Sequence, residues 1–497
     1  MTMEKKKTFY DIFSELNKIP RPSHHEGKVA DYLCRFAEEH GLEYKRDAEN
    51  CVVIKKPATP GYEDADTVVI LNHMDMVCVA KDDYLRDGRK FDPLNDEIRP
   101  YIETDEAGKR WMKAEGTSLG ADNGMGLSMA LAILADDSIV HPALEVLTTT
   151  NEEDGMSGAE ALSTDFISGR KVINLDSEAY NEITVGAAGA CLQVGRWELE
   201  YAPIPEGYKC FKIMMDGGLG GHSGVDINKG RCNCNHTLTT LLAEKFVDDT
   251  FKLKNDILVC ALNGGTANAS IASWAEAIVA IPQENADMLT ETVGEWSKTL
   301  REQYADTDAK INIRIEKAEA EQYVVDFGNA LKFISEIPYG VQCMRQDMPD
   351  TVMTSNNIGV IKTEGNEMTV SCHTRSFDNK DQDVLAEVCS NLMKIAGARE
   401  VKMLMNTSSW VERPDSPLLA MTCETFKDVL GFEPKKVAMH FVLEAAYYVE
   451  KYPGVEIASI GPLIIEPHST SERVCLDTAD DIWQVTVELL RRLAEKM

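Results

Sequence analysis

Three short apolar runs limit what the first part of this chain can fold into. They are Thr67–Leu71, Leu144–Thr149 and Val172–Leu175. Each is rich in apolar or β-branched residues, a pattern typical of strands that are buried on both faces. A mostly apolar helix is predicted over Met125–Leu134, between two of these strands. Strands that alternate with helices predict an α/β fold with a largely parallel sheet.

The pattern changes after residue 190. Glu367–Phe377 alternates apolar with polar residues, which predicts a strand in a sheet with one solvated face. Asp383–Ala396 has apolar residues at helical spacing and predicts an amphipathic helix beside that sheet. Together these elements indicate an α+β module.

Apolar runs return near residue 398, for example Val455–Ile460, and a closing helix is predicted over Asp481–Lys496. A chain of 497 residues is long enough for two domains. We therefore predict one α/β domain made of residues 1–188 and 398–497, interrupted by an inserted α+β domain at 189–397.

Charge and cysteine usage narrow the class of protein. There are 82 acidic against 51 basic residues, a formal net charge of −31, which disfavours nucleic acid and anionic membranes as partners. The 13 cysteines are scattered without a CxxC pair, which is typical of reduced thiols. The first residues lack the apolar region of a secretion signal, and no apolar run approaches the roughly 18 residues of a membrane span. We therefore expect a cytoplasmic protein.

Five stretches with histidine or acidic residues follow predicted strands or lie in the loops beyond them. In an open α/β sheet, ligands bind outside the carboxyl ends of the strands, so these stretches are expected to converge. The residues are His73 and Asp75, Asp122, Glu152 and Glu153, Asp176, and His468.

This many carboxylates cannot share one pocket unaided. Two carboxylates about 4 Å apart repel by about 4 kcal/mol at an effective dielectric constant of about 20. Bound divalent cations would remove that repulsion, and a set of histidines and carboxylates without cysteine suits Zn²⁺ or Mn²⁺. Two ions that share a bridging carboxylate would lie about 3.5–4 Å apart.

Six motifs in this order resemble those of the M20 metallopeptidases. They are HMDMV, GTSLGADNGMG, TNEEDGMSGA, NLDSE, GGHSG and GPxxxxPHS. The similarity runs from Ile19–Ser23 to Pro467–Ser469 and is greatest to the aminoacyl-histidine dipeptidase branch (PepD-like, cytosolic non-specific dipeptidases). It implies a zinc-exopeptidase-like catalytic domain with an inserted lid and dimerisation domain.

The resemblance also implies roles for individual residues of the catalytic domain. His73, Asp122 and Asp176 match the ligands of one zinc, and Glu153 and His468 match those of the other. Asp122 would bridge the two ions, and the family commonly holds the following peptide bond in the cis form.

Two acidic residues match catalytic positions of the family. Asp75 would orient His73, and Glu152 would act as general base toward a metal-bridged water. In the inserted domain, His222, Asn268 and Arg375 match residues that hold the substrate. His222 would stabilise the oxyanion, in its own subunit or across a dimer, and Arg375 would bind the C-terminal carboxylate.

The implied function is hydrolysis of unblocked dipeptides such as Xaa-His by a homodimer with two divalent ions per chain. Zn²⁺ is the first choice of ion, with Mn²⁺ and Co²⁺ as alternatives. An aminotripeptidase and an N-acyl amino acid deacylase of the same family remain alternatives. A non-catalytic metal- or peptide-binding relative is disfavoured, because Glu152 and Asp75 are both present.

Two features run against this interpretation or depart from it. The branch often carries the segment HAGLECG, but residues 440–446 here keep only the histidine, Leu443 and Glu444 of it. Gly116–Gly120 fits the GxSxG motif of serine hydrolases, with Ser118 as its serine. That motif needs a buried strand before it, which residues 110–115 do not predict, and it leaves the other acidic residues unexplained.

Overall fold

The computed structural model describes residues 7–411, 413 and 415–495, and these fall into two compact units. Unit 1 contains the chain up to Gly186, the segment that ends at Ala438, and the C-terminal part from Glu444 onward. Unit 2 contains Ala187–Val411 and the short segment Met439–Leu443.

These limits differ from the predicted insertion at 189–397. β21 (Glu400–Thr407) pairs with β11 (Gly189–Glu198), so the chain stays in unit 2 up to Val411. The Ala188 N–H group donates a hydrogen bond to the Met439 carbonyl, which joins the second segment to unit 2. Both corrections come from pairings between residues far apart in the sequence. The predicted end of the closing helix, Lys496, lies outside the described residues.

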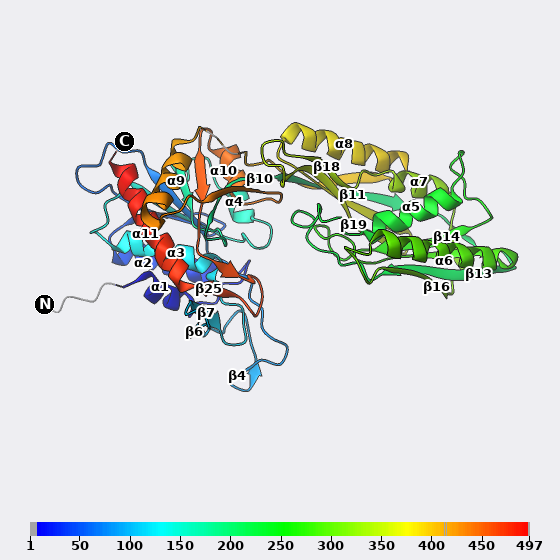
Figure 1. Cartoon of the computed structure of the whole chain (residues 1–497), viewed down its shortest axis with the longest axis horizontal. Coiled ribbons are helices and arrows are strands. Elements are labelled where there is room, and N and C mark those ends of the chain that lie inside the picture. The colour runs from blue at the N-terminus through cyan, green and yellow to red at the C-terminus, as the bar shows by residue number, and fades with distance from the viewer. Residues whose placement is uncertain (1–6, 412, 414, 496–497) are drawn as a thin grey trace. The chain divides into compact units, whose positions relative to one another are not determined.

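Unit 1 is built on an eight-stranded sheet in the order β1-β2-β8-β3-β9-β23-β10-β22. Figure 1 labels its strand β10. The four central strands, β8, β3, β9 and β23, are parallel to one another. The β1–β2, β2–β8 and β10–β23 ladders are antiparallel. The predicted parallel sheet is therefore present at the centre, with antiparallel pairs toward the edges. The central β3 and β8 are fully buried, as their apolar sequences predict.

The elements of unit 1 have the following bounds. The helices are α1 (Phe9–Leu16), α2 (Gly27–Glu39), α3 (Ala121–Ala135), α4 (Ser157–Ala161), α9 (Pro417–Leu430), α10 (Ala445–Lys451) and α11 (Leu476–Ala494). The strands are β1 (Glu43–Arg46), β2 (Val52–Lys56), β3 (Val68–His73), β4 (Leu85–Arg86), β5 (Arg89–Lys90), β6 (Pro100–Thr104), β7 (Arg110–Ala114), β8 (Leu144–Thr149), β9 (Lys171–Asn174), β10 (Glu182–Ala187), β22 (Lys435–Met439), β23 (Glu456–Ser459), β24 (Ile464–Ile465) and β25 (Arg473–Cys475).

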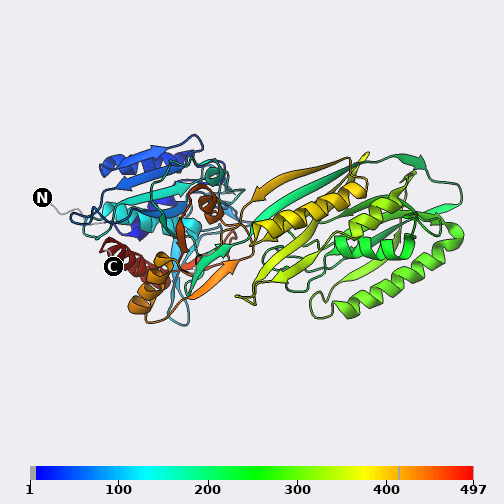
Figure 2. The same ribbon diagram turned by 90° about the horizontal axis from the view of Figure 1, so that it is seen from above.

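Unit 2 contains a nine-stranded sheet in the order β16-β13-β15-β14-β19-β20-β11-β21, with β18 paired to β19. Its described ladders are all antiparallel. Helices α5, α6, α7 and α8 contribute to one hydrophobic core with the sheet (Figure 2). Met368, Val370 and Cys372 of β20 lie in that core, as the alternation predicts.

The opposite face of β20 differs from the prediction. Ser371, His373 and Arg375 were expected on a solvated face, but all three are buried. Near Arg375, residues 222–223 of the same unit cover this face: the Arg375 guanidinium donates a 3.5 Å hydrogen bond to the Ser223 hydroxyl. Alternation identifies two faces of a strand but not what covers them.

The elements of unit 2 have the following bounds. The helices are α5 (Cys234–Phe246), α6 (Ala286–Gln303), α7 (Phe327–Ser335), α8 (Asn379–Ile395) and the 3₁₀ turn η1 (Gln283–Asn285). The strands are β11 (Gly189–Glu198), β12 (Tyr201–Pro203), β13 (Tyr208–Asp216), β14 (Leu258–Gly264), β15 (Ala275–Pro282), β16 (Asn312–Lys317), β17 (Gln322–Val324), β18 (Gly340–Met344), β19 (Val352–Glu364), β20 (Glu367–Ser376) and β21 (Glu400–Thr407).

All 13 cysteines are free thiols, in agreement with the sequence-based prediction. Within the described part of the chain, no helix combines the length and the apolar composition that crossing a membrane requires.

Candidate active site

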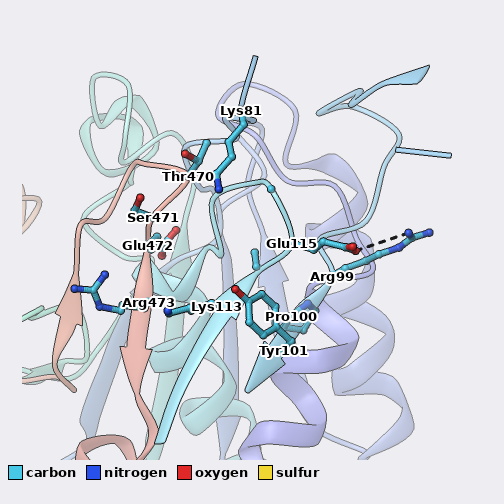
Figure 3. Close-up of a pocket in the computed structure, with 12 residues that line it drawn as sticks. Lys81, Arg99, Pro100, Tyr101, Lys113, Glu115, Thr470, Ser471, Glu472 and Arg473 are labelled. Atoms are coloured by element: carbon cyan, nitrogen blue, oxygen red, sulfur yellow. Dashed lines mark ion pairs between the residues drawn. The ribbon is translucent and has the colours of Figure 1, made fainter. Parts of the chain in front are cut away.

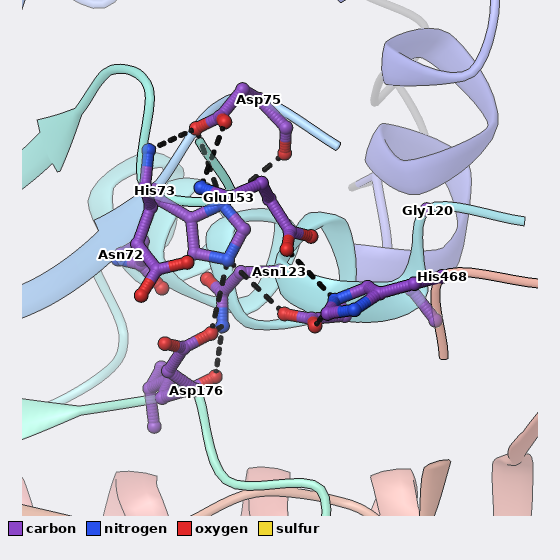
Figure 4. A network of polar contacts seen from close by, with 12 residues as sticks. Asn72, His73, Asp75, Gly120, Asn123, Glu153, Asp176 and His468 are labelled. Atoms are coloured by element: carbon purple, nitrogen blue, oxygen red, sulfur yellow. Dashed lines mark hydrogen bonds and ion pairs between the residues drawn. The ribbon is translucent and has the colours of Figure 1, made fainter. Parts of the chain in front are cut away.

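The parallel strands of unit 1 bring the predicted ligands to one edge of the sheet. His73 is the last residue of β3, Asp176 follows the end of β9 by two residues, and Glu153 lies in the loop after β8. β8, β3 and β9 are neighbours and parallel, so their carboxyl ends meet at the same edge. Asp122 lies at the start of α3, and His468 lies in the loop after β24. Figure 4 shows His73, Glu153, Asp176 and His468 gathered in this site.

One oxygen of Asp122 belongs to a first set of three donor atoms. His73 Nε2 lies 3.1 Å from Asp122 Oδ1 and 3.3 Å from Asp176 Oδ1. Ligand atoms about 2.0–2.1 Å from a tetrahedral zinc lie about 3.3–3.4 Å from one another. The observed distances therefore fit three ligands around one ion.

The other oxygen of Asp122 belongs to a second set. His468 Nε2 lies 3.1 Å from Asp122 Oδ2 and 2.7 Å from Glu153 Oε2. The second carboxylate oxygen of Glu153 is buried and has no hydrogen-bond partner. A buried carboxylate oxygen without a partner is costly unless a cation or donor satisfies it, so the residues present fit a second ion.

The electrostatics of the site favour bound cations. Burial lowers the pKa of His73, but the neighbouring carboxylates, Asp176 first, outweigh burial and raise that pKa well above its ordinary value. Hydrogen bonds to Asp122 and Glu153 raise the pKa of His468 to about 11. The same negative field that retains protons on these two imidazoles would attract divalent cations in their place.

Asp75 connects the first ligand set to the adjacent glutamates. Asp75 Oδ1 lies 3.5 Å from His73 Nδ1, and the Glu152 N–H group donates to the same oxygen at 3.0 Å. Asp75 Oδ2 accepts hydrogen bonds from the Glu153 N–H group at 3.2 Å and from the Ser23 hydroxyl at 2.7 Å. One buried carboxylate thus fixes the histidine ring and the backbone of both glutamates.

Glu152 is half-buried. Burial raises its pKa well above the ordinary value, and the carboxylates of Asp176, Glu153 and Glu444 add to that shift. A carboxyl group with a raised pKa can accept a proton and later release it near neutral pH.

The peptide bond between Asp122 and Asn123 is cis, as the resemblance predicts. The Asn123 side-chain amide donates to the Leu175 carbonyl and to Asp176 Oδ1, both at 2.6 Å. Asn123 therefore links the start of α3 to the loop that carries Asp176.

Unit 2 holds the predicted substrate-binding residues. The N–H groups of Gly224 and Val225 both donate to His222 Nδ1 at 3.3 Å, which leaves the ring proton on Nε2. Burial and the nearby Arg375 lower the pKa of His222 to about 4, so the ring is a neutral donor. Asn268 is half-buried.

The Arg375 guanidinium is buried beside three imidazoles. The pKa values of His222, His373 and His440 are all lowered, first by burial and next by the charge of Arg375. Among the described residues, no carboxylate acts on the buried Arg375 guanidinium. Its Nε atom is buried without a partner. A buried cation without a counter-ion is well suited to bind an external anion.

The serine-hydrolase alternative does not fit the geometry. The Ser118 hydroxyl is buried and donates to the Val77 carbonyl at 2.7 Å. Asp176 and His468, which would complete a triad, contact His73 and Asp122 instead.

The model of peptidase family M20/M25/M40 matches residues 69–496. The chain belongs to this family. As a member of this peptidase family, the M20 chain is a hydrolase of peptide bonds.

Two relatives are similar to the M20 chain over nearly its whole length. The cytosol non-specific dipeptidase of Escherichia coli (strain K12) is 32% identical over 491 residues, which cover 98% of each chain. The crystal structure of aminoacylhistidine dipeptidase from Vibrio alginolyticus matches with a TM-score of 0.84 and 32% identity, covering 97% of this chain and 96% of that one. A tripeptidase from Staphylococcus aureus matches with a TM-score of 0.60 at 14% identity, which shows the fold alone.

Sequence reasoning missed several residues that contact the loops of this M20 site. Ser23 binds Asp75, and Glu26 Oε1 accepts a 2.8 Å hydrogen bond from the Asn151 N–H group, directly before the two glutamates. Both lie just before or at the start of α2, about 50 to 130 residues from their partners. The only sequence signal was their place in or next to the Ile19–Ser23 motif.

A cavity of about 600 Å³ lies in unit 1 beside the loop that follows His468 (Figure 3). Its basic lining residues are largely paired already: Lys113 contacts Glu103 at 2.6 Å and Arg473 contacts Glu466 at 3.3 Å. Among the described residues that line it, none is a candidate metal ligand. The candidate metal ligands therefore do not line this cavity, although Glu472, which does, accepts a hydrogen bond from the Asp122 N–H group.

Proposed function

We propose that this chain is a two-metal dipeptidase that hydrolyses unblocked dipeptides, Xaa-His among them. One observation carries the proposal: Asp122 directs one carboxylate oxygen to His73 and the other to His468. A carboxylate divided in this way between two donor sets is suited to bridge two divalent ions. Zn²⁺ is the preferred ion for the donor set His73, Asp122, Asp176, Glu153 and His468.

Bound divalent ions would polarise the scissile carbonyl and lower the pKa of water in the site. The chain supplies the proton transfer and the orientation. Glu152 takes a proton from the attacking water and returns it to the leaving amine, which its raised pKa supports. Asp75 orients His73 and fixes the backbone of Glu152, as its hydrogen bonds support.

The residues of unit 2 recognise the substrate in this proposal. His222, with its proton on Nε2, donates a hydrogen bond to the developing oxyanion, in its own subunit or in the partner. Arg375 binds the free C-terminal carboxylate as the counter-ion that it otherwise lacks. Asn268 contributes a side-chain amide to the same binding surface.

The preference for dipeptides is supported by the names of the two relatives, a non-specific dipeptidase and an aminoacylhistidine dipeptidase. The relative from Escherichia coli is a cytosol enzyme, and the free thiols of this chain fit the same compartment. We therefore propose a cytoplasmic location.

We further propose that the chain forms a homodimer through unit 2. Three apolar side chains, Val384, Val388 and Ile395, are exposed along one side of α8. Strand β21, at the edge of the sheet, also exposes Met403 and Leu404. Apolar surface beside an edge strand is typical of an interface between copies of a chain.

A substrate panel tests the proposed activity. The metal-loaded protein is assayed with a free dipeptide, its C-terminal amide, its N-acetyl derivative and a tripeptide, and with Xaa-His against other dipeptides. We expect the free dipeptides to have the highest kcat/KM. Preference for the tripeptide or the N-acetyl compound would replace the dipeptidase proposal, and full activity in a verified metal-free preparation would refute the two-metal site.

A further inference from the structure

Two fully buried charged side chains, Arg21 and Glu472, hold the loops of the site without belonging to either donor set. Arg21 is 1% exposed and Glu472 is 3% exposed. Their hydrogen bonds go to backbone groups of the ligand-bearing loops, and Arg21 Nε is buried without a partner.

The Glu472 carboxylate accepts four consecutive backbone N–H groups before and at the start of α3. Oε2 accepts from Leu119 at 2.7 Å and from Gly120 at 2.9 Å. Oε1 accepts from Ala121 at 2.8 Å and from Asp122 at 3.4 Å. α3 has no capping side chain of its own, so Glu472 performs that role from a distant part of the chain.

Glu472 thereby connects two ligands of the second donor set. It follows His468 by four residues, and its own N–H group donates to the Ser469 carbonyl at 3.2 Å. Its carboxylate binds the backbone of Asp122, whose Oδ2 lies 3.1 Å from His468 Nε2. The separation between the His468 loop and Asp122 is therefore fixed through Glu472.

Arg21 connects two ligands of the first donor set in the same way. Its Nη1 atom donates to the carbonyls of Met74 at 3.2 Å and Asp75 at 3.1 Å, directly after His73. Its Nη2 atom donates to the Gly120 carbonyl at 2.7 Å, two residues before Asp122.

Gly120 allows this approach of the arginine. A Cβ atom at this position would lie 2.6 Å from Arg21 Nη2 and 2.5 Å from Met76 Sδ. Gly120 also has a φ of 68°, a conformation that other residues rarely adopt.

Stability alone does not account for this arrangement. Burying a guanidinium and a carboxylate carries a desolvation cost that apolar side chains of similar volume would avoid. Each charge instead forms three or four directed hydrogen bonds to loops that carry ligands.

We infer that Arg21 and Glu472 are positioning residues that set the spacing of the two donor sets around Asp122. Arg21 holds the His73 loop against the Asp122 loop, and Glu472 holds the His468 loop against the same residue. This inference rests on the proposed two-metal site.

The test compares metal binding by Glu472→Gln and Arg21→Lys with that of the wild type. Each chain is stripped of metal and titrated calorimetrically with Zn²⁺, and the Mn²⁺-loaded forms are compared by electron paramagnetic resonance, which detects coupling between two close ions. In Glu472→Gln, one acceptor oxygen faces four N–H groups, and in Arg21→Lys the shorter side chain cannot reach three carbonyls. For both variants we expect zinc affinity to fall about 10- to 100-fold. The coupled manganese signal should weaken, and kcat for a free dipeptide should fall more than KM rises.

Glu145→Gln is the matched control. Glu145 is also a buried carboxylate of unit 1 that accepts two backbone N–H groups, from Ser168 at 2.7 Å and Gly169 at 2.9 Å, but it contacts no candidate ligand. This variant should melt at a lower temperature and keep the zinc affinity of the wild type. If Glu472→Gln does not fold, Glu472→Asp, one methylene too short to reach all four N–H groups, takes its place.

The outcomes separate the inference from the function on which it rests. A wild type that fails to bind two ions refutes the two-metal proposal itself. The inference is overturned if the wild type binds two ions and the Glu472 and Arg21 variants bind zinc with the same affinity and show the same manganese coupling. The two residues would then only stabilise the fold.

Discussion

At the scale of single residues, the adjacent Glu152 and Glu153 offer the sharpest distinction. Glu153 Oε2 lies 2.7 Å from His468 Nε2, whereas the Glu152 carboxyl is assigned to proton transfer. Glu152→Gln removes the proton acceptor and keeps the side-chain size, so turnover should fall about 100-fold or more with both ions retained. Glu153→Gln should instead lose metal. Turnover and metal content are measured on both variants.

If Glu152→Gln keeps a rate near that of the wild type, or loses metal as Glu153→Gln does, the roles of the two glutamates are assigned the wrong way round.

Arg375 provides a second residue-scale prediction. The buried guanidinium of Arg375 is proposed to bind the substrate carboxylate. Arg375→Ala should therefore lower kcat/KM for a free dipeptide, and the fall should correspond to about 2–4 kcal/mol of lost transition-state binding. The C-terminal amide of that dipeptide should be a poor substrate of the wild type and nearly insensitive to the substitution. Arg399→Ala, which changes an exposed arginine of the same unit, serves as the control.

The measurement is kcat/KM for the free and the amidated dipeptide on all three proteins. Equal losses on both substrates would show that Arg375 does not bind the carboxylate.

At the scale of elements, α3 must approach the end of β9 closely to bring Asp122 near Asp176. Gly126 permits this, because a Cβ atom there would lie 2.2 Å from the Leu175 carbonyl oxygen. Gly126→Ala should therefore displace α3, lower the melting temperature and weaken zinc binding. Gly294→Ala is the matched change in α6, where nothing lies within 4 Å of the added atom, and should stabilise by about 0.5–1 kcal/mol.

Calorimetric melting and zinc titration test both variants. If the Gly126→Ala protein keeps the melting temperature and the zinc affinity of the wild type, the close contact between α3 and the Leu175 segment is not needed for stability or for metal binding.

The connection from β8 to the segment before β9 depends on the charge of Glu145. Although burial raises the pKa of this carboxyl, hydrogen bonds from Gly169, Lys55 and Ser168 outweigh burial and hold it below the ordinary value. A carboxyl with a depressed folded-state pKa stabilises fully above the unfolded value of about 4.3, and this stabilisation is lost as pH falls through the folded value.

Glu145→Gln should therefore lower stability by about 2 kcal/mol near pH 7. The difference in melting temperature from the wild type should shrink as the pH is lowered through 4. If the difference in melting temperature does not change with pH, the charge of Glu145 is not what stabilises the fold.

At the scale of the whole molecule, metal binding should be coupled to proton release. In a chain with a formal charge of −31, carboxylates raise the pKa of both His73 and His468. Each ring must lose its extra proton before it can bind a metal, so zinc binding at pH 7 should release about two protons per chain. Calorimetric titration in buffers of different ionisation enthalpy measures this number. No proton release would contradict the assignment of the two histidines as ligands.

The proposed dimer gives a prediction of its own. Replacing Val384 and Val388 on α8 by aspartate should place like charges across a two-fold interface and yield a monomer. Light scattering after size exclusion measures the mass of the wild type and the double variant. A wild type that is monomeric at assay concentration, or a double variant that remains dimeric, would remove α8 from the interface.

Local features of this protein could be predicted from its residues alone. Apolar runs predicted β3, β8 and β9, and the order of short motifs identified the family together with the five side chains that converge in unit 1. These features follow from residue types at short spacing, which fix the periodicity of strands and the chemistry of donor atoms.

The burial of individual residues, and the segments that cover them, could not be predicted in this way. The pairing of β21 with β11 extended unit 2 to Val411, and the polar face of β20 around Arg375 proved to be buried. In the sequence, Arg21 and Glu472 are ordinary charged residues. The fold places Arg21 against residues 74–75. It places Glu472 against residues 119–122, which lie about 350 residues before it in the chain. Burial and long-range hydrogen bonds depend on which distant segments pack together, and local spacing carries no record of that choice.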